Sequence, residues 1–215
     1  MRIERDSPAL CRDFTGGEIE AVDIGDPAGA IDNAVGLDLA AGKVAAEWGK
    51  IALDPHLRST SNPAVHVCGD AVTETAQLSP IATYEGRIVG GNIVDGPKHT
   101  PDYTGIPSCV FTVPALASVG LTQADAEANG SEVYVAVNDM HEWLSGRTYA
   151  LSAAWSKVVI DKSTDRILGA HLLGHDAEEL IHIFALAIKH RITATELREF
   201  VYGFPTFSAD IKSML

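Results

Sequence analysis

The chain has 215 residues, of which 46% are hydrophobic and 21% are charged, and its formal net charge is −13. A chain of this length can bury one large core or two small ones. The negative charge opposes binding to nucleic acid or to an anionic membrane surface, and no stretch reaches the ~18 consecutive apolar residues that a membrane span needs. We therefore expect neither nucleic acid nor a membrane among its partners.

The cysteines, Cys11, Cys68 and Cys109, are odd in number and far apart in the sequence. This pattern favours neither a disulfide framework nor a zinc site, and it fits a reducing compartment. Residues 1–14 mix charged and apolar side chains and lack the apolar block of a signal peptide. The sequence therefore predicts a cytoplasmic protein without a metal site.

Residues 1–26 contain one strand-like run, at residues 18–24, which a Gly-Asp-Pro turn at residues 25–27 closes. This segment is too short to fold alone. We interpret it as the tail of a further domain.

Residues 27–104 have an α/β pattern. Residues 50–54 are predicted as a short strand and residues 64–68 as a second, β-branched strand that ends at Gly69. A buried parallel strand that ends in Gly-Asp places a carboxylate, here Asp70, at the sheet edge where doubly wound folds bind ligands. Gly69 lets a ligand approach the backbone, and Asp70 can accept a hydrogen bond from a sugar or polyol hydroxyl.

A helix is predicted over residues 80–94, with Ser79 as the N-cap and Pro80 at the first helical position. Its free N–H groups and positive dipole end would point toward a ligand at the strand end. This arrangement suits an isoalloxazine ring, whose N1–C2=O2 edge gains negative charge on reduction. A plain strand–turn–helix with a capping aspartate is equally compatible with these residues.

Residues 105–215 have an α+β pattern. Four strands are expected, at residues 109–113, 133–137, 157–160 and 167–173, and the polar turn at residues 161–166 predicts that the last two form a hairpin. Two helices follow, each opening with a capping-box sequence, at residues 176–179 and 193–196. One face of the first helix is apolar and carries Leu180, Ile181, Phe184 and Ile188.

Residues 65–87 resemble the second flavin-contact motif of the pyridine nucleotide–disulfide oxidoreductases, the family of glutathione reductase, dihydrolipoamide dehydrogenase and mercuric reductase. The likeness continues through segments that are typical of that family's C-terminal dimerisation domain, namely residues 106–114, 117–122, 166–171 and 205–206. Residues 25–27 stand where the family has a Gly-Arg-x-Pro turn. The resemblance therefore covers the chain from about residue 20 onward.

The resemblance implies a role for two groups of residues. Asp70, which follows Gly69, would hold the ribityl chain of FAD. The helix start would face the pyrimidine edge of the flavin, and it comprises Leu78, Ser79, Pro80 and Ile81.

The resemblance also implies a fold and a division into domains. The fold would be α/β plus α+β, with a partial doubly wound FAD-domain segment followed by an α+β dimerisation domain. Residues 1–26 would be the tail of a nicotinamide-binding domain, residues 27–104 the C-terminal part of the FAD-binding domain, and residues 105–215 the dimerisation domain. The full-length protein would bind FAD and NAD(P)H and form a homodimer through the C-terminal domain.

Two family motifs are missing from the sequence. It contains no Gly-x-Gly-x-x-Gly, so neither dinucleotide has its usual pyrophosphate loop, and no redox-active Cys-x-x-x-x-Cys. Full family members are more than twice as long. We therefore expect the chain to be a C-terminal fragment that is inactive alone and binds flavin weakly or not at all.

The last family motif departs from the pattern. Where the classical enzymes have an acid/base histidine and glutamate, this chain has Phe204 and Ala209, and Asp210 is one residue out of place. The chain also ends without the vicinal cysteines of mercuric reductases. These departures favour a branch that passes hydride through flavin to a non-thiol acceptor, and no residue of this chain is expected to be catalytic. The alternative is a stand-alone dimerisation or interaction module without redox activity.

The remaining histidines have simpler interpretations. His171 and His175 are four residues apart, but on a strand and the loop after it, so we do not expect a shared metal. His182 and His190 lie on a predicted helix and suit a surface or an interface. Residues 140–143 are expected to form a loop near the dimer cleft.

Overall fold

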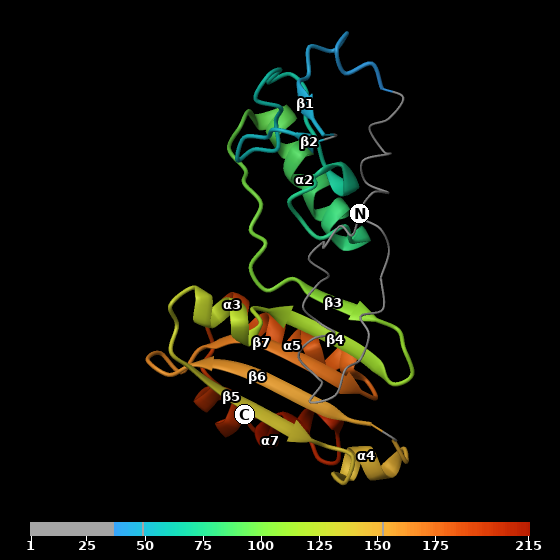
Figure 1. Ribbon diagram of the computed structural model, residues 1–215, viewed down its shortest axis with the longest axis vertical. Helices are drawn as coiled ribbons and strands as arrows, with labels where there is room; N and C mark the ends of the chain where they lie inside the picture. Colours follow the sequence, from blue (N-terminus) through green and yellow to red (C-terminus); the bar gives the residue numbers. More distant parts are fainter. Residues whose placement is uncertain (1–36, 49, 152) are drawn as a thin grey trace, which may run out of the picture. The chain divides into compact units, whose positions relative to one another are not determined.

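The computed structural model describes residues 37–48, 50–151 and 153–215 (Figure 1). The described residues divide into two compact units, with the boundary between Asp102 and Tyr103. We call them the N-terminal unit (37–102) and the C-terminal unit (103–215). The strand-like run predicted at residues 18–24 and the turn after it lie outside the described residues. Within the described part, no helix is both long and apolar enough to cross a membrane.

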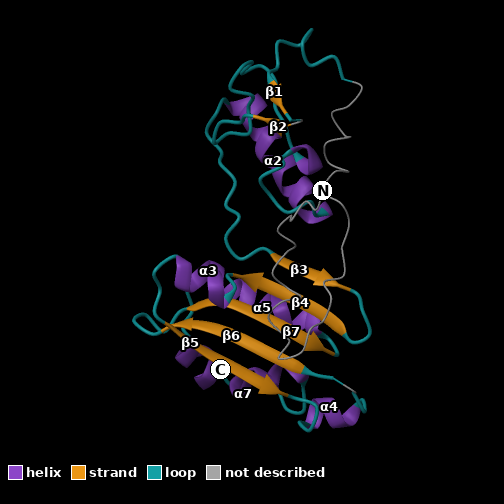
Figure 2. Ribbon diagram, viewed as in Figure 1, coloured by secondary structure: helices purple, strands orange, loops and turns teal. Residues whose placement is uncertain are grey.

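The N-terminal unit is built around one long helix (Figure 2). Its elements are the antiparallel strands β1 (Ala46–Glu47) and β2 (Lys50–Ile51), the 3₁₀ turn η2 (Gly69–Ala71) and the helix α2 (Ser79–Asp95). The small apolar core is made of Leu57, Val67 and Val72, with Ile88 and Val89 of α2 packed against it.

The strand predicted at residues 64–68 does not form. This segment makes a single bridge, between Arg58 and His66, and the Val67 N–H donates to the Leu57 carbonyl at 2.9 Å. A strand needs a partner ladder, and the described residues supply only this one pair. The strand predicted at residues 50–54 is likewise limited to Lys50–Ile51.

The start of α2 also differs from the prediction by one residue. Leu78, not Ser79, is the N-cap, and its carbonyl accepts the N–H groups of Ile81 and Ala82 at 2.9 and 3.1 Å. Pro80 is therefore the second helical residue. The helix ends at Asp95, and Gly96 follows with a φ of 81°.

The C-terminal unit is an antiparallel five-stranded sheet with strand order β3-β4-β7-β6-β5. Its strands are β3 (Pro107–Val110), β4 (Ala115–Gly120), β5 (Val133–Asp139), β6 (Trp155–Asp161) and β7 (Ile167–Gly174). The predicted β6–β7 hairpin is confirmed. Strand β4 was not predicted, because its sequence ALASVG is rich in small residues with little β propensity.

The helices of this unit are α3 (Gln123–Ala128), α4 (Leu144–Thr148), α5 (Ala177–His190), α6 (Ala194–Glu199), η3 (Phe207–Asp210) and α7 (Ile211–Met214). Figure 1 shows α5 and α7 on the same face of the sheet, and both contribute to one core. The predicted apolar face of α5 is buried at Leu180, Ile181 and Phe184, and Ile188 packs at its edge.

One of the two predicted capping boxes is correct. At α6 the Thr193 side chain accepts from the Glu196 N–H at 3.1 Å, and Glu196 accepts from the Thr193 N–H at 2.8 Å. At α5 the box is wrong, because Asp176 has a left-handed backbone (φ 57°) and makes no side-chain cap. Its carboxylate lies 3.3 Å from Nε2 of His175 instead.

His171 is a structural residue of the sheet. Its side chain is 1% exposed, and its Nδ1 lies 2.7 Å from the hydroxyl of Ser118 on the neighbouring strand. Its Nε2 lies 3.3 Å from the Leu121 carbonyl, which can only accept a hydrogen bond. No group of three potential metal ligands occurs among the described residues.

We predict that Gly169→Ala destabilises the C-terminal unit and that Gly174→Ala on the same strand does not. A methyl group at Gly169 would overlap the Leu121 carbonyl, whereas at Gly174 it would lie 3.8 Å from Ala154, an ordinary contact. We expect the free energy of unfolding in urea, followed by tryptophan fluorescence, to fall by about 2–3 kcal/mol for Gly169→Ala only. Equal losses in the two variants would contradict this prediction.

Candidate functional site

The predicted flavin-contact residues meet at the first turns of α2. Gly69 opens η2 with a φ of 68°, and a Cβ at this position would lie 3.2 Å from the Cβ of Ala82. Both the backbone conformation and the close approach to the helix therefore favour glycine. Asp70 follows with its side chain exposed, and the Gln77 amide donates to its carbonyl at 3.3 Å.

Glu85 attaches this turn to the helix. Its carboxylate is fully buried, with Oε2 accepting the Gly69 N–H at 2.6 Å and Oε1 accepting the Thr75 hydroxyl at 3.3 Å. Glu85 was not predicted from the sequence. Its signal is the helical spacing of Ile81, Glu85 and Asn92, which places all three on one face of α2.

The start of α2 is available to a ligand. The N-cap makes no side-chain hydrogen bond, and the first turn contains no acidic residue. Pro80 has no N–H, and the N–H groups of Ile81 and Ala82 already bond to Leu78. Among the described residues the Ser79 N–H has no acceptor, and Ser79 is exposed. An exposed carboxylate beside an uncapped helix start fits the hydroxyls and carbonyls of a flavin.

A second place of interest surrounds Phe204 and Ala209, the two positions at which the resemblance led us to expect an acid/base pair. Phe204 is 79% exposed in the loop before η3. Ala209 is half-buried within η3, and its N–H bonds to the hydroxyl and carbonyl of Thr206 at 3.3 and 3.1 Å. Neither side chain can exchange a proton.

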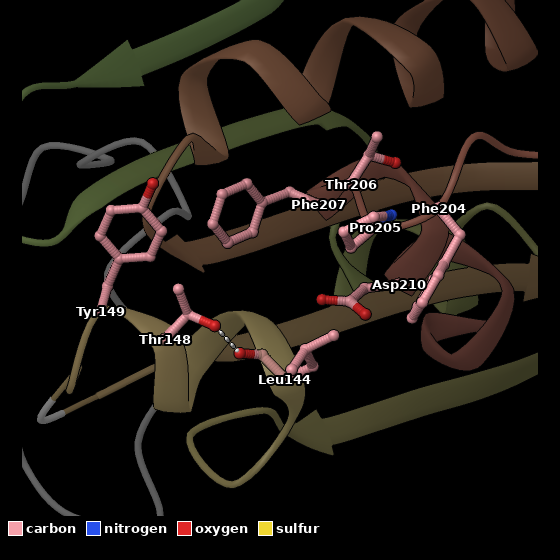
Figure 3. A pocket seen from close by; sticks show the side chains of 8 residues that line it. All are labelled: Leu144, Thr148, Tyr149, Phe204, Pro205, Thr206, Phe207 and Asp210. Atoms are coloured by element: carbon pink, nitrogen blue, oxygen red, sulfur yellow. Dashed lines mark hydrogen bonds between the residues drawn. The ribbon is translucent and has the colours of Figure 1, made fainter.

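Phe204 borders a cavity of about 390 Å³ (Figure 3). Its lining is mainly apolar and aromatic and consists of Leu144, Thr148, Tyr149, Phe204, Pro205, Thr206, Phe207 and Asp210. In Figure 3 the Asp210 carboxylate points into the cavity, between Leu144 and Phe204. Asp210 is therefore the carboxylate that shares this cavity with Phe204.

Aromatic contacts fix one wall of this cavity. Tyr149 stacks on His175 with ring centroids 3.9 Å apart, and Phe207 lies 5.3 Å from Tyr149 and 5.1 Å from His175. His175 is thus part of an aromatic cluster and does not share a site with His171. Tyr149 also lines an adjoining groove, together with Val113, whose side chain is fully exposed.

The remaining cysteine and histidine side chains of interest lie outside these two places. Burial raises the pKa of the Cys109 thiol, and the negative charges of Glu178 and Glu179 raise it further, which disfavours the thiolate. At residues 140–143, the Asp139 carboxylate accepts from Nδ1 of His141 at 2.9 Å, and this bond raises the pKa of His141. His182 and His190 are exposed on α5.

Comparison with known proteins places this geometry in a family. The sequence profile of the pyridine nucleotide-disulphide oxidoreductase dimerisation domain matches residues 106–215, just over half of the chain. An uncharacterized 19.7 kDa protein in a mercuric resistance operon of Staphylococcus aureus is 35% identical over 180 residues, which are 83% of this chain and 100% of that protein. Glutathione reductase from Burkholderia cepacia is 33% identical over 219 residues, which are 100% of this chain and 48% of the enzyme.

Solved structures agree with the sequence comparison. The HOCl-induced flavoprotein disulfide reductase RclA from Escherichia coli superposes with a TM-score of 0.72 at 25% identity, over 82% of this chain and 41% of RclA. The chain thus spans about half the length, or less, of the enzymes that it matches. The likeness confirms the fold class and the resemblance inferred from the sequence. The chain belongs to the pyridine nucleotide-disulphide oxidoreductase family.

Proposed function

We propose that the chain is the C-terminal part of a flavoprotein oxidoreductase that uses FAD and NAD(P)H, and that it is inactive alone. One observation carries this proposal: the Gly69–Ala71 turn is bonded to α2 through Glu85, next to a helix start whose Ser79 N–H has no acceptor among the described residues. In this proposal residues 1–26 belong to the nicotinamide-binding domain, residues 27–104 to the FAD-binding domain and residues 105–215 to the dimerisation domain. The protein would act in the cytoplasm.

The residues of the Gly69–Ala71 turn and those at the start of α2 would contact different parts of the flavin. Asp70 would accept a hydrogen bond from a ribityl hydroxyl, and Gly69 would allow the ligand to approach the backbone. The helix start, made of Leu78, Ser79, Pro80 and Ile81, would face the pyrimidine edge, where the helix dipole stabilises negative charge. Bound FAD would supply the hydride relay between NAD(P)H and the acceptor.

The acceptor would not be a disulfide. Reduction of a disulfide needs an acid/base group at the thiols, and Phe204 and Ala209 cannot provide one. The apolar and aromatic lining of the cavity beside Phe204 supports a non-thiol acceptor.

A second proposal, a stand-alone dimerisation module without redox activity, is favoured by one comparison. The chain matches the Staphylococcus aureus protein along the whole length of that protein, which has about the size of this chain. Both proposals include a homodimer through the C-terminal unit. Exposed apolar side chains along the two adjoining cavities support such an interface, namely Val113, Tyr149 and Phe204.

We predict that the chain is a dimer at tens of micromolar and that Val113→Asp converts it to a monomer. A charge at this fully exposed valine would be buried without a partner in the interface, which costs several kcal/mol. Sedimentation velocity measures the change. The matched control is Val94→Asp, at an 83% exposed valine of the N-terminal unit, which should stay dimeric. A monomeric wild-type chain would contradict both proposals on this point.

We predict that the chain alone binds FAD with a Kd above about 1 µM, because one polar edge of the flavin would be held without the pyrophosphate loop. In isothermal titration, Asp70→Asn should reduce the heat of FAD binding. The control Glu74→Gln, at an exposed neighbouring residue, should leave it unchanged. Submicromolar affinity would show that the missing loop is not needed. A colourless dimer without any heat of flavin binding would favour the stand-alone module.

We predict that a full-length protein containing this chain reduces artificial acceptors well and disulfides poorly. Replacing Phe204 by His together with Ala209 by Glu should raise disulfide turnover by about 10²–10⁴-fold, because it restores a proton-exchanging pair. Diaphorase activity should stay nearly unchanged. Efficient disulfide reduction by the unmodified protein would refute the prediction. Loss of that activity in Asp210→Asn would then identify Asp210 as the base.

A further inference from the structure

Glu85 is a buried carboxylate that the proposed flavin chemistry does not use. It lies on α2 and is 0% exposed. Burying an ionised carboxylate is costly unless hydrogen bonds replace its lost water. Two such bonds come from one short segment, from the Gly69 N–H at 2.6 Å and from the Thr75 hydroxyl at 3.3 Å. Glu85 therefore joins two parts of the chain that are 10 and 16 residues away from it.

The segment that Glu85 binds is the one that carries Asp70. The Gly69 N–H donates to Oε2 of Glu85 at 2.6 Å, a short hydrogen bond between a backbone amide and a carboxyl oxygen. The turn is closed on its other side by the Val72 N–H, which donates to the Gly69 carbonyl at 2.8 Å. Both peptide groups of Gly69 are thereby held, and Asp70 is the next residue.

Gly69 packs closely against α2. A Cβ at Gly69 would lie 3.2 Å from the Cβ of Ala82 on the first turns of α2, and the Gly69 N–H donates to Glu85 of the same helix. Without an acceptor at position 85 this half-buried N–H would lose the hydrogen bond that Glu85 provides. Such a loss costs about 1–3 kcal/mol, enough to release a surface turn.

We propose that Glu85 is a positioning residue: its buried carboxylate holds the Gly69–Ala71 turn against α2, so that the Asp70 carboxylate stands beside the helix start. The inference rests on the proposed function only for its ligand, a flavin ribityl chain. The bond to the Gly69 N–H can be tested without any flavin.

The first test uses the chain itself and the amide proton of Gly69. In ¹⁵N-labelled protein we expect this amide to exchange slowly. Glu85→Ala should accelerate its exchange by about 100-fold, and Glu85→Gln, which keeps an acceptor oxygen, by about tenfold or less. The amide of Ile88, also on α2, reports whether the helix stays folded. Glu74→Gln, at an exposed glutamate of the same segment, is the control and should change nothing. Unchanged Gly69 exchange in Glu85→Ala, with the helix intact, would overturn the inference.

The second test uses a full-length protein that contains this chain. We expect Glu85→Gln to weaken FAD binding about tenfold and to shift the flavin absorption bands, because Asp70 would no longer be held in place. Glu85→Ala should weaken binding more, and Glu74→Gln should not change it. Faster Gly69 exchange with unchanged flavin affinity and spectrum would overturn the positioning role. A full-length protein that takes up no FAD would refute the proposed function, while the Gly69 exchange would still decide whether Glu85 holds the turn.

Discussion

Helix α2 buries two polar side chains, and the N-terminal unit is organised by what they bind. Glu85 accepts the N–H of Gly69 near one end of the helix, and Asn92 bonds through its amide to the carbonyls of His56 and His99 near the other end. The apolar core between them is small, with the buried side chains of Leu57, Val67 and Val72 at its centre. Because this core buries so little surface, directional hydrogen bonds fix where the loops lie on the helix. The candidate ligand site is therefore built from the same bonds that fold the unit.

The C-terminal unit depends on apolar packing instead. Helix α5 buries Ile181, Phe184 and Ala187 completely against the sheet, and each large side chain contributes about 1.5–3 kcal/mol. The same core takes in Leu197 of α6 and Ile211 of α7. The loop between these helices is thus anchored at both ends while Phe204 in its middle stays exposed. A rigid core with an exposed apolar loop is the arrangement expected where a chain contacts another protein molecule.

The cavity beside Phe204 combines these features. One side comes from α4 and Tyr149 and the other from the loop and η3, so its shape depends on packing between segments about 55 residues apart in the sequence. Its aromatic wall is fixed by ring contacts among Tyr149, His175 and Phe207. The Phe204 ring and the Asp210 carboxylate both line this cavity, so a mainly apolar wall and one carboxylate lie side by side in it.

The sequence by itself determined the features that are encoded locally. The β6–β7 hairpin follows from two mainly apolar runs around a polar turn, and the capping box at Thr193–Glu196 from residues three positions apart. The apolar face of α5 follows from helical periodicity, and the family resemblance is visible in short runs. In each case the interacting residues are close in sequence, so propensity and spacing suffice to find them.

Only the tertiary structure decided the rest. Strand β4 has weak β propensity and exists because β3 and β7 pair with it on either side, whereas residues 64–68 have strong propensity but no ladder to join. Asp176 is a residue type that commonly caps helices, but its backbone is left-handed and its side chain makes no cap hydrogen bond. Glu85 and Asp210 acquire their places through partners far along the chain. Such pairings depend on which surfaces meet in three dimensions, because hydrogen-bond partners and burial belong to the packed chain and not to any single segment of it.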